Sequence, residues 1–573
     1  MPSPLPSPLR TPWADQVDPD AVLPEHPRPQ LYRPRWRSLN GWWEYTGGAE
    51  RYRGRILVPF PPESALSGVG RRDEVMWYRR TFEVPDGWRD GRVLLHFGAV
   101  DQRAAVWVNH QLVAEHEGGY TAFDADVTGV LRAGGEQELV VRAEDVGNRG
   151  TFPVGKQALR PGGILYTGAS GIWQPVWLET VGPAYVAALD PVTDLAGFAV
   201  TPRVVGKGAS SVDVVVRAGD TEVARASAPV GRRVRVDVPD PRPWSPDDPF
   251  RYDLTVRLLD ADGRVLDEVA SHVGLRTVSL VDDERGRPRI ALNGRVTVLH
   301  GPLDQGYWPD GIYTAPTDEA LRFDLERAKA LGFNCVRKHV KVEPARWYDW
   351  AERIGLLVWQ DMPSLPVLLD NPPGPQAPPV AEARRHFEAE LLEMVARLRW
   401  CTAIVGWVPF NEGWGEYDTA RIAGLVKAAD PTRLVIADSG VNCCHSQPDS
   451  GAGDVYDDHT YVGPGRPEAR DHRAVLDGEY GGLGLVVAGH VWPGEPMAYE
   501  MCASRAELTR RYVEVSAEVA RLVPELGLSG AIYTQLTDVE TEVNGLLTYD
   551  RRVLKVDPEA VADHNRAVIT TPP

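Results

Sequence analysis

Asn411 and Glu412 stand side by side just after residues 403–408, a short apolar run with the composition of a buried strand. A glycine-rich turn follows, and Trp407 and Trp414 flank the pair. A carboxylic acid there can protonate the leaving oxygen of a sugar acetal, and the neighbouring amide can bind a sugar hydroxyl. The indole rings can pack against the apolar face of a sugar ring. We therefore predict that Glu412 is a general acid/base in acetal cleavage.

A second carboxylate, Glu479, follows the strand-like residues 474–476 and precedes a pair of glycines. Retaining glycosidases hold a nucleophile and an acid/base with their carboxyl groups about 5–5.5 Å apart. The environments of the two groups must differ, so that the acid keeps its proton and the nucleophile stays ionised. We predict that Glu479 is the nucleophile. A hydroxyl from Tyr480 or a guanidinium from Arg337 is expected to keep it ionised.

Further polar side chains follow other predicted strands, and we predict that they bind substrate together with Asn411 and Trp414. They are Asp304, Arg337, Asp361, His459, Tyr461 and Gln535. Histidines and aspartates at this density raise the question of a metal site. However, the chain has no HxH or HExxH spacing, and acetal cleavage by two carboxylates requires no metal. We expect neither a metal nor another cofactor.

The part of the chain that carries these residues alternates helices with short apolar strands. Thr317 is a predicted N-cap, and a buried stripe of Leu321, Leu325 and Ala328 follows it. Gly332 ends that helix, and a strand begins at the next residues. Repeated strand–helix units over residues 280–573 predict a closed (β/α)8 TIM barrel. Catalytic groups in such barrels lie at the carboxyl ends of the strands.

Two all-β regions precede the predicted barrel. Residues 91–100 and 104–116 read as strands, and Asn109-His110 is the expected turn inside the second run, so residues 1–183 are predicted to form a sugar-binding-like jelly-roll β-sandwich. Residues 184–279 contain further runs with period-two alternation, at 211–216 and 233–238. We predict an immunoglobulin-like β-sandwich there, without the cysteine pair of antibody domains.

The composition narrows the range of partners. The 573 residues carry a net charge of −18, which disfavours nucleic acid and anionic membrane surfaces as partners. Five cysteines without CxxC spacing predict neither a disulfide framework nor a zinc site. Residues 1–13 lack the apolar stretch of a secretory signal, and no run of about 18 apolar residues suggests a membrane span. We expect a cytoplasmic protein.

Motifs along nearly the whole chain resemble glycoside hydrolase family 2, the group of β-galactosidases, β-glucuronidases and β-mannosidases. The resemblance rests on residues 38–45 (SLNGWWEY), 58–64, 76–85, 116–123 and 170–179 (SGIWQPVWLE) in the first region, and on 292–301 and 317–340 at the start of the barrel. It implies that Glu412 is the acid/base and Glu479 the nucleophile of an exo-acting retaining enzyme. It also implies that Asn411 binds the hydroxyl next to the anomeric carbon.

Several departures from the family pattern affect which sugar we expect as the substrate. Residues 337–342 read RKHVKV where the family has Arg-Thr-Ser-His-Tyr-Pro, and the last barrel strand ends at Gln535 in place of the common Trp. Asn544 is followed by Gly545 and Leu546, so the Asn-x-Lys grip of glucuronidases is missing. Within the family, the stretch at residues 336–364 most resembles a compact bacterial branch. We expect a terminal galactosyl-type residue, β-galactopyranosyl or β-galactofuranosyl. The alternatives are α-L-arabinosidase, β-mannosidase and β-glucuronidase.

A different class of function is a non-catalytic carbohydrate-binding protein. That reading predicts loss of the carboxylate at position 412 or 479, and both are present. Transglycosylation uses the same two carboxylates and stays open beside hydrolysis. In every reading the partner is a small carbohydrate or glycoside, and a homo-oligomer is compatible with the sequence.

Overall fold

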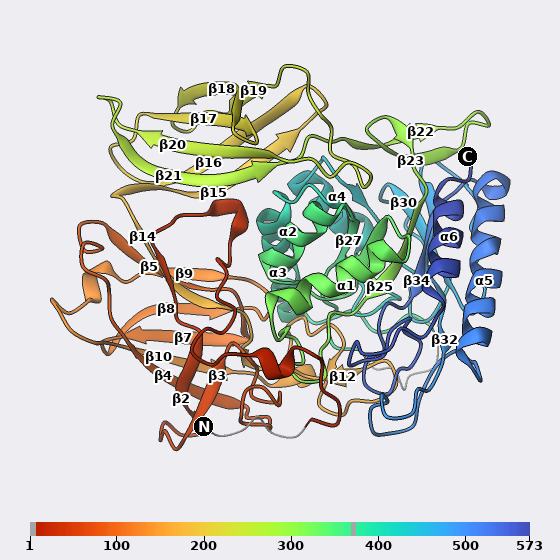
Figure 1. Cartoon of the computed structure of the whole chain (residues 1–573), viewed down its shortest axis with the longest axis horizontal. Helices are drawn as coiled ribbons and strands as arrows, with labels where there is room; N and C mark the ends of the chain where they lie inside the picture. The colour runs from red at the N-terminus through yellow and green to blue at the C-terminus, as the bar shows by residue number, and fades with distance from the viewer. Residues whose placement is uncertain (1–6, 368–373, 573) are drawn as a thin grey trace.

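The computed structural model describes residues 7–367 and 374–572. Two β-sandwiches and a barrel follow one another along the chain. In Figure 1 the first sandwich is red to orange, the second is yellow-green, and the barrel runs from green to blue. The predicted fold class, jelly roll followed by immunoglobulin-like sandwich and TIM barrel, is confirmed. We keep the domain boundaries at 183/184 and 279/280 as our own division of the chain.

The jelly roll packs a six-stranded sheet against a four-stranded one. The first sheet has the order β3 (Gly54–Val58), β2 (Gly41–Gly47), β4 (Val75–Phe82), β10 (Gln137–Glu144), β7 (Arg103–Val108) and β8 (Gln111–Glu117). The second has the order β1 (Trp36–Ser38), β14 (Val176–Val181), β5 (Arg92–Phe97) and β9 (Phe123–Asp126). Two short pairs complete it, β6 (Val100–Asp101) with β13 (Gly171–Ile172) and β11 (Gln157–Ala158) with β12 (Tyr166–Thr167).

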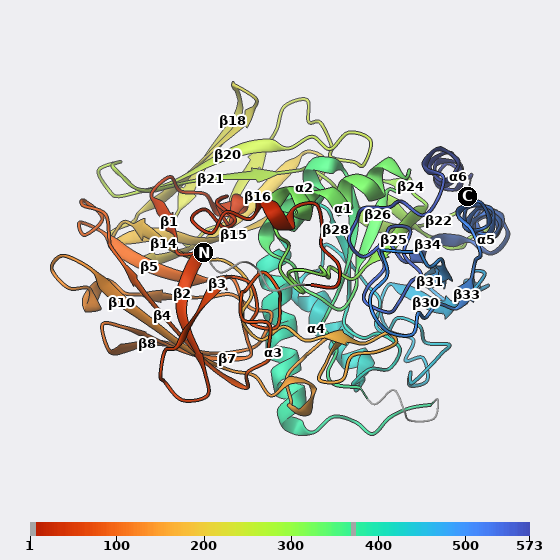
Figure 2. The same cartoon turned by 60° about the horizontal axis from the view of Figure 1, so that its bottom comes forward.

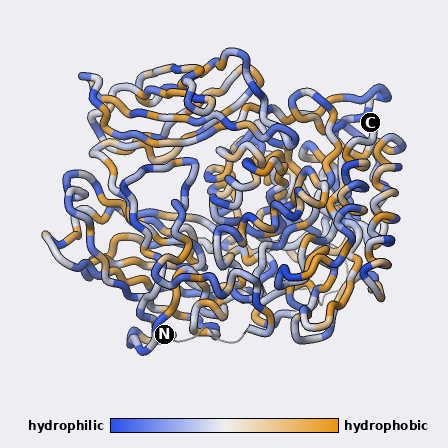
Figure 3. The backbone as a smooth tube through the Cα atoms, viewed as in Figure 1, coloured by the Kyte–Doolittle hydropathy of each residue, from blue (hydrophilic) through white to orange (hydrophobic). Residues whose placement is uncertain are grey.

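Strand periodicity explains the core of this sandwich. Along β7, Ala104, Val106 and Val108 point inward while the residues between them are half-buried. Asn109 and His110 both have positive φ and form the two-residue turn that joins β7 to β8, which confirms that prediction. Hydrophilic and hydrophobic positions are interspersed along the chain in both sandwiches (Figure 3).

The second sandwich has a three-stranded and a four-stranded sheet around a valine-rich core. The three-stranded sheet contains β15 (Ala184–Thr193), β16 (Gly197–Gly206) and β19 (Val234–Asp237). The other contains β18 (Thr221–Pro229), β17 (Ser211–Ala218), β20 (Tyr252–Leu259) and β21 (Val265–Val273). A small sheet of β22 (Val278–Asp282), β23 (Pro288–Leu292) and β24 (Arg295–Val296) then leads into the barrel.

Eight parallel strands form the barrel, and a bridge between Ile436 and Val455 joins the first strand of the sheet order to the last. The order is β29 (Leu434–Val435), β28 (Ile404–Val408), β27 (Leu357–Asp361), β26 (Cys335–Lys338), β25 (Leu299–Asp304), β34 (Leu528–Thr534), β31 (Ala474–Gly481) and β30 (Val455–Thr460). A short parallel pair of β32 (Leu483–Gly484) and β33 (Glu500–Met501) lies in the connection after β31. This closure brings all eight strand ends to one mouth.

Helices cover the outside of the barrel. They are α1 (Asp318–Ala330), α2 (Ala345–Ile354), α3 (Ala381–Leu398), α4 (Thr419–Ala429), α5 (Arg505–Leu526) and α6 (Pro558–Ile569). The side chain of Thr317 accepts a hydrogen bond from the backbone N–H of Ala320, so the predicted N-cap is confirmed. Among the described residues, no helix is both long and apolar enough to cross a membrane.

Helix α3 also lies along the border with the jelly roll (Figure 2). Glu390 on this helix accepts a hydrogen bond from the backbone N–H of Tyr120, and His386 lies 3.1 Å from the hydroxyl of Thr151. The jelly roll is thus anchored to the outside of the barrel through α3.

Two strands extend beyond the predicted ends. His459 lies within β30 and Glu479 within β31, whereas both were expected just after their strands. Register shifts interrupt the pairing at these positions. Such bulges let a strand continue while they re-aim individual side chains, and they are common beside active sites. The polar residues therefore stand on the wall of the barrel near its mouth.

Candidate active site

The carboxyl end of every barrel strand supplies a polar group to the mouth. In strand order from β25 these are Asp304, Arg337, Asp361, Asn411 with Glu412, Ser439, His459, Glu479 and Thr534 with Gln535. All of them are buried. Because parallel strands end at one edge, residues far apart in sequence meet here.

The turn that carries Glu412 requires a left-handed backbone conformation at two successive residues. Glu412 has φ +52, and its N–H donates to the carbonyl of Ser439 at 2.8 Å. The next residue, Gly413, has φ +74, and a Cβ there would lie 2.1 Å from the backbone of His445. Only glycine fits this close approach. The local sequence thus fixes the carboxyl of Glu412 at the mouth.

One imidazole lies between the two carboxylates. Nδ1 of His459 is 2.9 Å from Oε1 of Glu412 and 3.7 Å from Oε1 of Glu479. An oxygen of Glu412 and an oxygen of Glu479 lie within 4.8 Å of each other. Inverting glycosidases need about 6.5–9.5 Å between carboxyl groups to admit a water, whereas retaining ones need about 5–5.5 Å. The separation fits the retaining arrangement.

Glu479 is surrounded by cations. Burial alone would raise its pKa, but the charges of His459 and Arg337 outweigh burial and lower the pKa to about 2. Nη1 of Arg337 lies 3.5 Å from Oε1, and Tyr461 donates its hydroxyl proton to Oε2. Glu479 is therefore ionised at neutral pH, as a nucleophile must be.

The interaction between Glu479 and His459 raises the pKa of His459, whereas it lowers that of Glu479. Burial disfavours its charged form, yet Glu479 and the hydrogen bond to Glu412 raise its pKa to about 9. Its other nitrogen lies 2.8 Å from the hydroxyl of Ser439. Gly440 makes room for this ring, since a Cβ there would lie 2.7 Å from its Nδ1. His459 is thus an imidazolium held between two acids.

Arg337 organises the other side of the mouth. Its Nε donates to both carboxyl oxygens of Asp361 at 3.1 Å, and its Nη2 donates to the side-chain oxygen of Asn411 at 2.7 Å. Asp361 also accepts from Nδ1 of His339 at 2.8 Å. The amide nitrogen of Asn411 has no protein partner within the described ranges, so this donor is available to a sugar hydroxyl.

Of the two groups expected beside Glu479 only Arg337 lies there, and the side chain of Trp407 also lies outside the mouth, for the same reason as Tyr480. The hydroxyl of Tyr480 contacts His300 and Ser516 instead of Glu479, and the indole of Trp407 donates to Asp430. Successive residues of a strand point to opposite faces. Tyr480 and Trp407 consequently point outward from the barrel, and Tyr461 supplies the hydroxyl that was expected from Tyr480.

The remaining predicted residues lie around this centre. Trp414 is fully buried, with its ring centroid 6.4 Å from that of His339. Gln535 donates to Asn544 at 2.7 Å, next to Thr534, whose hydroxyl lies 3.5 Å from Glu479. Asp304 belongs to a separate ion cluster, where it accepts from Nζ of Lys338 at 2.8 Å; Lys338, Lys341 and Glu343 complete that cluster.

Sequence patterns did not reveal two features of the mouth. Cys443 and Cys444 are joined by a disulfide, and Sγ of Cys443 lies 3.7 Å from Oε1 of Glu412. No spacing rule for disulfides covers adjacent cysteines. The second feature is Lys156, which reaches this region from the jelly roll, and a sequence gives no signal for a contact across domains.

Glu412, His459 and Glu479 offer three potential metal-ligand atoms within 4.8 Å. A metal needs the neutral form of an imidazole. The pKa of about 9 keeps His459 protonated at neutral pH, because its two acidic neighbours favour the charged form. The arrangement thus suits an ion pair better than a metal site.

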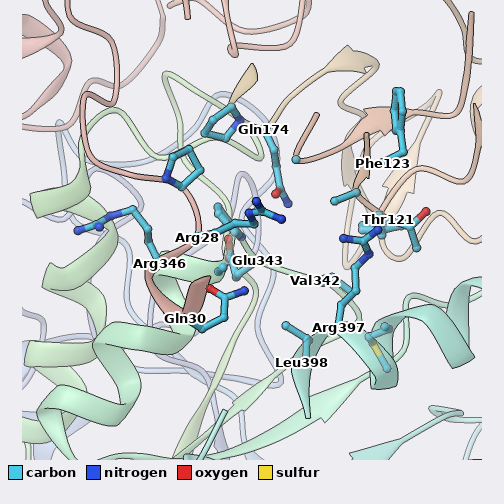
Figure 4. A pocket seen from close by; sticks show the side chains of 18 of the residues that line it. Arg28, Gln30, Thr121, Phe123, Gln174, Val342, Glu343, Arg346, Arg397 and Leu398 are labelled. Carbon is cyan, nitrogen blue, oxygen red and sulfur yellow. The ribbon is translucent and has the colours of Figure 1, made fainter. Parts of the chain in front are cut away.

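A large cavity lies away from these carboxylates. We call it the interdomain cavity; it measures about 810 Å³ and is lined by the N-terminal segment, both sandwiches, α2 and α3. Figure 4 shows Arg28, Arg346 and Arg397 around it. These three arginines are already paired, Arg28 with Glu179, Arg346 with Asp318 and Arg397 with Glu393.

Family comparisons cover all three regions. The model described as "Glycosyl hydrolases family 2, sugar binding domain" matches residues 49–147, "Glycosyl hydrolases family 2" matches 193–276, and "Glycosyl hydrolases family 2, TIM barrel domain" matches 288–458. The last match includes Glu412 and ends before Glu479.

Curated relatives are distant. A β-galactosidase of Thermoanaerobacter pseudethanolicus is 26% identical over 73% of this chain, and the chain spans 54% of that relative. A β-glucuronidase of Paenibacillus borealis is 25% identical over 70% of this chain and 72% of its own length. Among solved structures, a β-glucuronidase from Ruminococcus gnavus in complex with D-glucaro 1,5-lactone has a TM-score of 0.75 at 19% identity, covering 94% of this chain and 99% of that one.

Proposed function

The chain belongs to glycoside hydrolase family 2, and from that premise we propose that it is a retaining, exo-acting glycosidase with Glu479 as nucleophile and Glu412 as acid/base. The observation that carries the proposal is that a carboxyl oxygen of Glu412 and one of Glu479 lie within 4.8 Å of each other. The low pKa of Glu479 suits attack on an anomeric carbon.

The reaction follows in two displacements. Glu479 attacks the anomeric carbon while Glu412 gives its proton to the leaving oxygen, so the glycosidic bond breaks and a glycosyl ester forms. Glu412, now ionised, takes a proton from water, whose oxygen attacks the same carbon and releases Glu479. Two inversions give net retention.

The neighbouring groups have distinct roles in this proposal. Arg337 fixes the amide oxygen of Asn411, so that the free amide N–H groups can bind the hydroxyl beside the anomeric carbon. His459 donates to Glu412 and its positive charge also stabilises Glu479. Asp361 orients Arg337 through two hydrogen bonds. Tyr461 holds the second oxygen of Glu479.

A terminal galactosyl-type sugar, β-galactopyranosyl or β-galactofuranosyl, is the proposed substrate. The side chain of Asn544 is engaged by Gln535 and Glu542, and no lysine follows it two residues later. A carboxylate grip of that kind is therefore absent from this position. The names of the relatives favour β-glucuronide as the second candidate, since β-glucuronidases recur among them.

A panel of nitrophenyl glycosides tests the proposal. It contains β-galactopyranoside, β-galactofuranoside, α-arabinofuranoside, β-mannoside and β-glucuronide. We expect cleavage of a galactosyl member, with the first-formed product retaining its anomeric configuration in proton NMR spectra. Inversion would overturn the two-step mechanism. Absence of cleavage across the panel, with sugar binding intact, would favour a carbohydrate-binding protein.

A further inference from the structure

Lys156 belongs to the jelly roll, yet it stands at the mouth of the barrel. It lies between η4 (Gly147–Arg149) and β11 and is only 4% exposed. Its ammonium lies 5.8 Å from the ring centroid of Trp414, two residues after Glu412. On its other side it lies 5.5 Å from the ring of Tyr166. The side chain thus crosses from one domain to the sugar subsite of another.

The loop that carries Lys156 is fixed to the barrel. The N–H groups of Val154 and Gly155 both donate to the carbonyl of Ser364, at 2.8 and 3.0 Å. Gly155 has φ +60, and a Cβ there would lie 2.4 Å from the carbonyl oxygen of Val340. The N–H of Tyr166 donates to the carbonyl of Lys156 itself. These contacts position the lysine without involving its ammonium.

Three other buried lysines show what a buried ammonium ordinarily requires. Lys338 pairs with Asp304 at 2.8 Å, Lys341 with Glu343 at 2.9 Å, and Lys555 with Asp538. Within residues 7–367 and 374–572, the ammonium of Lys156 makes neither a hydrogen bond nor an ion pair. Burying a charge without hydrogen-bond partners is costly. The three N–H donors of Lys156 therefore lack the carboxylate acceptors that the protein supplies to the other three lysines.

The charge of Lys156 also reaches the nucleophile. Burial acts to raise the pKa of Glu479, and the charge of Lys156 is among those that lower it instead. The same charge disfavours protonation of His339, although burial is the main reason for the lowered pKa of that ring. Glu479 and His339 thus both lie within electrostatic range of the ammonium.

We propose that Lys156 is a glycone-binding residue, whose ammonium donates to an oxygen of the sugar that Glu479 attacks. The inference rests on the proposed glycosidase function and extends it by a specificity group from a second domain. The oxygen belongs to a ring hydroxyl of a neutral sugar or to the carboxylate of an acidic sugar. Both are acceptors for an ammonium, and the carboxylate forms the stronger bond.

The test compares Lys156→Met with Lys207→Met, an exposed lysine of the second sandwich that serves as control. With the best glycoside of the panel, Lys156→Met is expected to lower kcat/KM by about 10- to 100-fold for a hydroxyl partner, and more for a carboxylate. Matched galactoside and galacturonide substrates show whether the acceptor for Lys156 is a hydroxyl or a carboxylate. Lys207→Met should retain the activity of the unmodified chain.

Binding measured without turnover separates recognition from electrostatic effects on Glu479. In a Glu412→Gln background, Lys156→Met should weaken calorimetric binding of the intact glycoside by a similar factor. Gly155→Ala keeps the lysine but displaces its loop, so it should weaken binding as well. Unchanged binding and unchanged kcat/KM in Lys156→Met would overturn the inference, even if the unmodified chain is an active glycosidase. Failure of the unmodified chain to cleave any glycoside would instead count against the proposed function, while the binding comparison would still decide the role of Lys156.

Discussion

The mouth of the barrel and the interdomain cavity both lie where the jelly roll meets the barrel, and both contain buried charges. In the mouth the charges are shared, because His459 contacts Glu412 and Glu479 together. In the cavity the arginines form separate pairs, such as Arg346 with Asp318 and Arg397 with Glu393. Coupled groups change each other's pKa, whereas isolated pairs mainly fix domains in place.

Volume is therefore a poor guide to the site of chemistry in this molecule. The cavity of about 810 Å³ is large enough for a ligand, yet Arg28, Arg346 and Arg397 on its wall are each held in an ion pair. The mouth retains an unsatisfied amide donor on Asn411 next to an ionised carboxylate, and the ammonium of Lys156 makes no hydrogen bond to the described residues. Variants of the two regions should accordingly affect different properties.

Glu479→Ala is expected to produce the largest effect. Loss of the nucleophile should lower kcat on the order of 10⁴-fold or more, and azide should restore part of the turnover with an inverted glycosyl azide as product. Product analysis by NMR measures this directly. Near-normal turnover in the variant would remove Glu479 from the mechanism.

Glu412→Gln should have a large effect that depends on the leaving group. Loss of a general acid costs about 10²- to 10⁴-fold for sugars with poor leaving groups, and less for nitrophenyl glycosides, which leave without a proton. The matched control is Glu393→Gln on the wall of the interdomain cavity, which should keep its kcat. An equal loss with both kinds of leaving group would contradict the acid/base role.

The ion pair in the mouth predicts a stability change at alkaline pH. The pKa of His459 is raised from 6.5 to about 9 by Glu479 and by its hydrogen bond to Glu412, against the effect of burial. Its stabilising contribution is complete below pH 6.5 and is lost as pH rises through 9. Denaturant unfolding between pH 6.5 and 10 should show this loss. In His459→Asn, the free energy of unfolding should not show this decrease with rising pH.

Glu390→Gln tests the cavity and should give the smallest effect. Burial raises the pKa of Glu390 to about 8, so the folded state binds a proton that the unfolded state releases above about pH 4.5. Stability is therefore lost between pH 4.5 and 8, and glutamine should remove that loss, with a gain on the order of 1 kcal/mol at pH 8. Activity should not change. A loss of kcat would show that the cavity takes part in catalysis.

The fold was largely predictable because its signals are local. Period-two alternation in β7 and the N-cap at Thr317 follow from short stretches of sequence. The two carboxylates were found because each follows an apolar strand-like run. Tyr480 was misassigned because β31 continues through Gly481 beyond its predicted end, so that Glu479 and Tyr480 are successive strand residues and point to opposite faces. Lys156 was missed because its relation to Trp414 exists only after two domains dock.

The contact of Gly155 with Val340 has a consequence for how such enzymes diversify. If Lys156 binds the sugar as proposed, the jelly roll is more than a spacer, since its loop at Gly155 contacts Val340 and Ser364 of the barrel. Exchange of jelly rolls between homologous chains would then transfer sugar preference together with the loop, while the chemistry stayed with the barrel. Selectivity and reactivity would be inherited as separate modules, with Gly155 at one of the contacts between them.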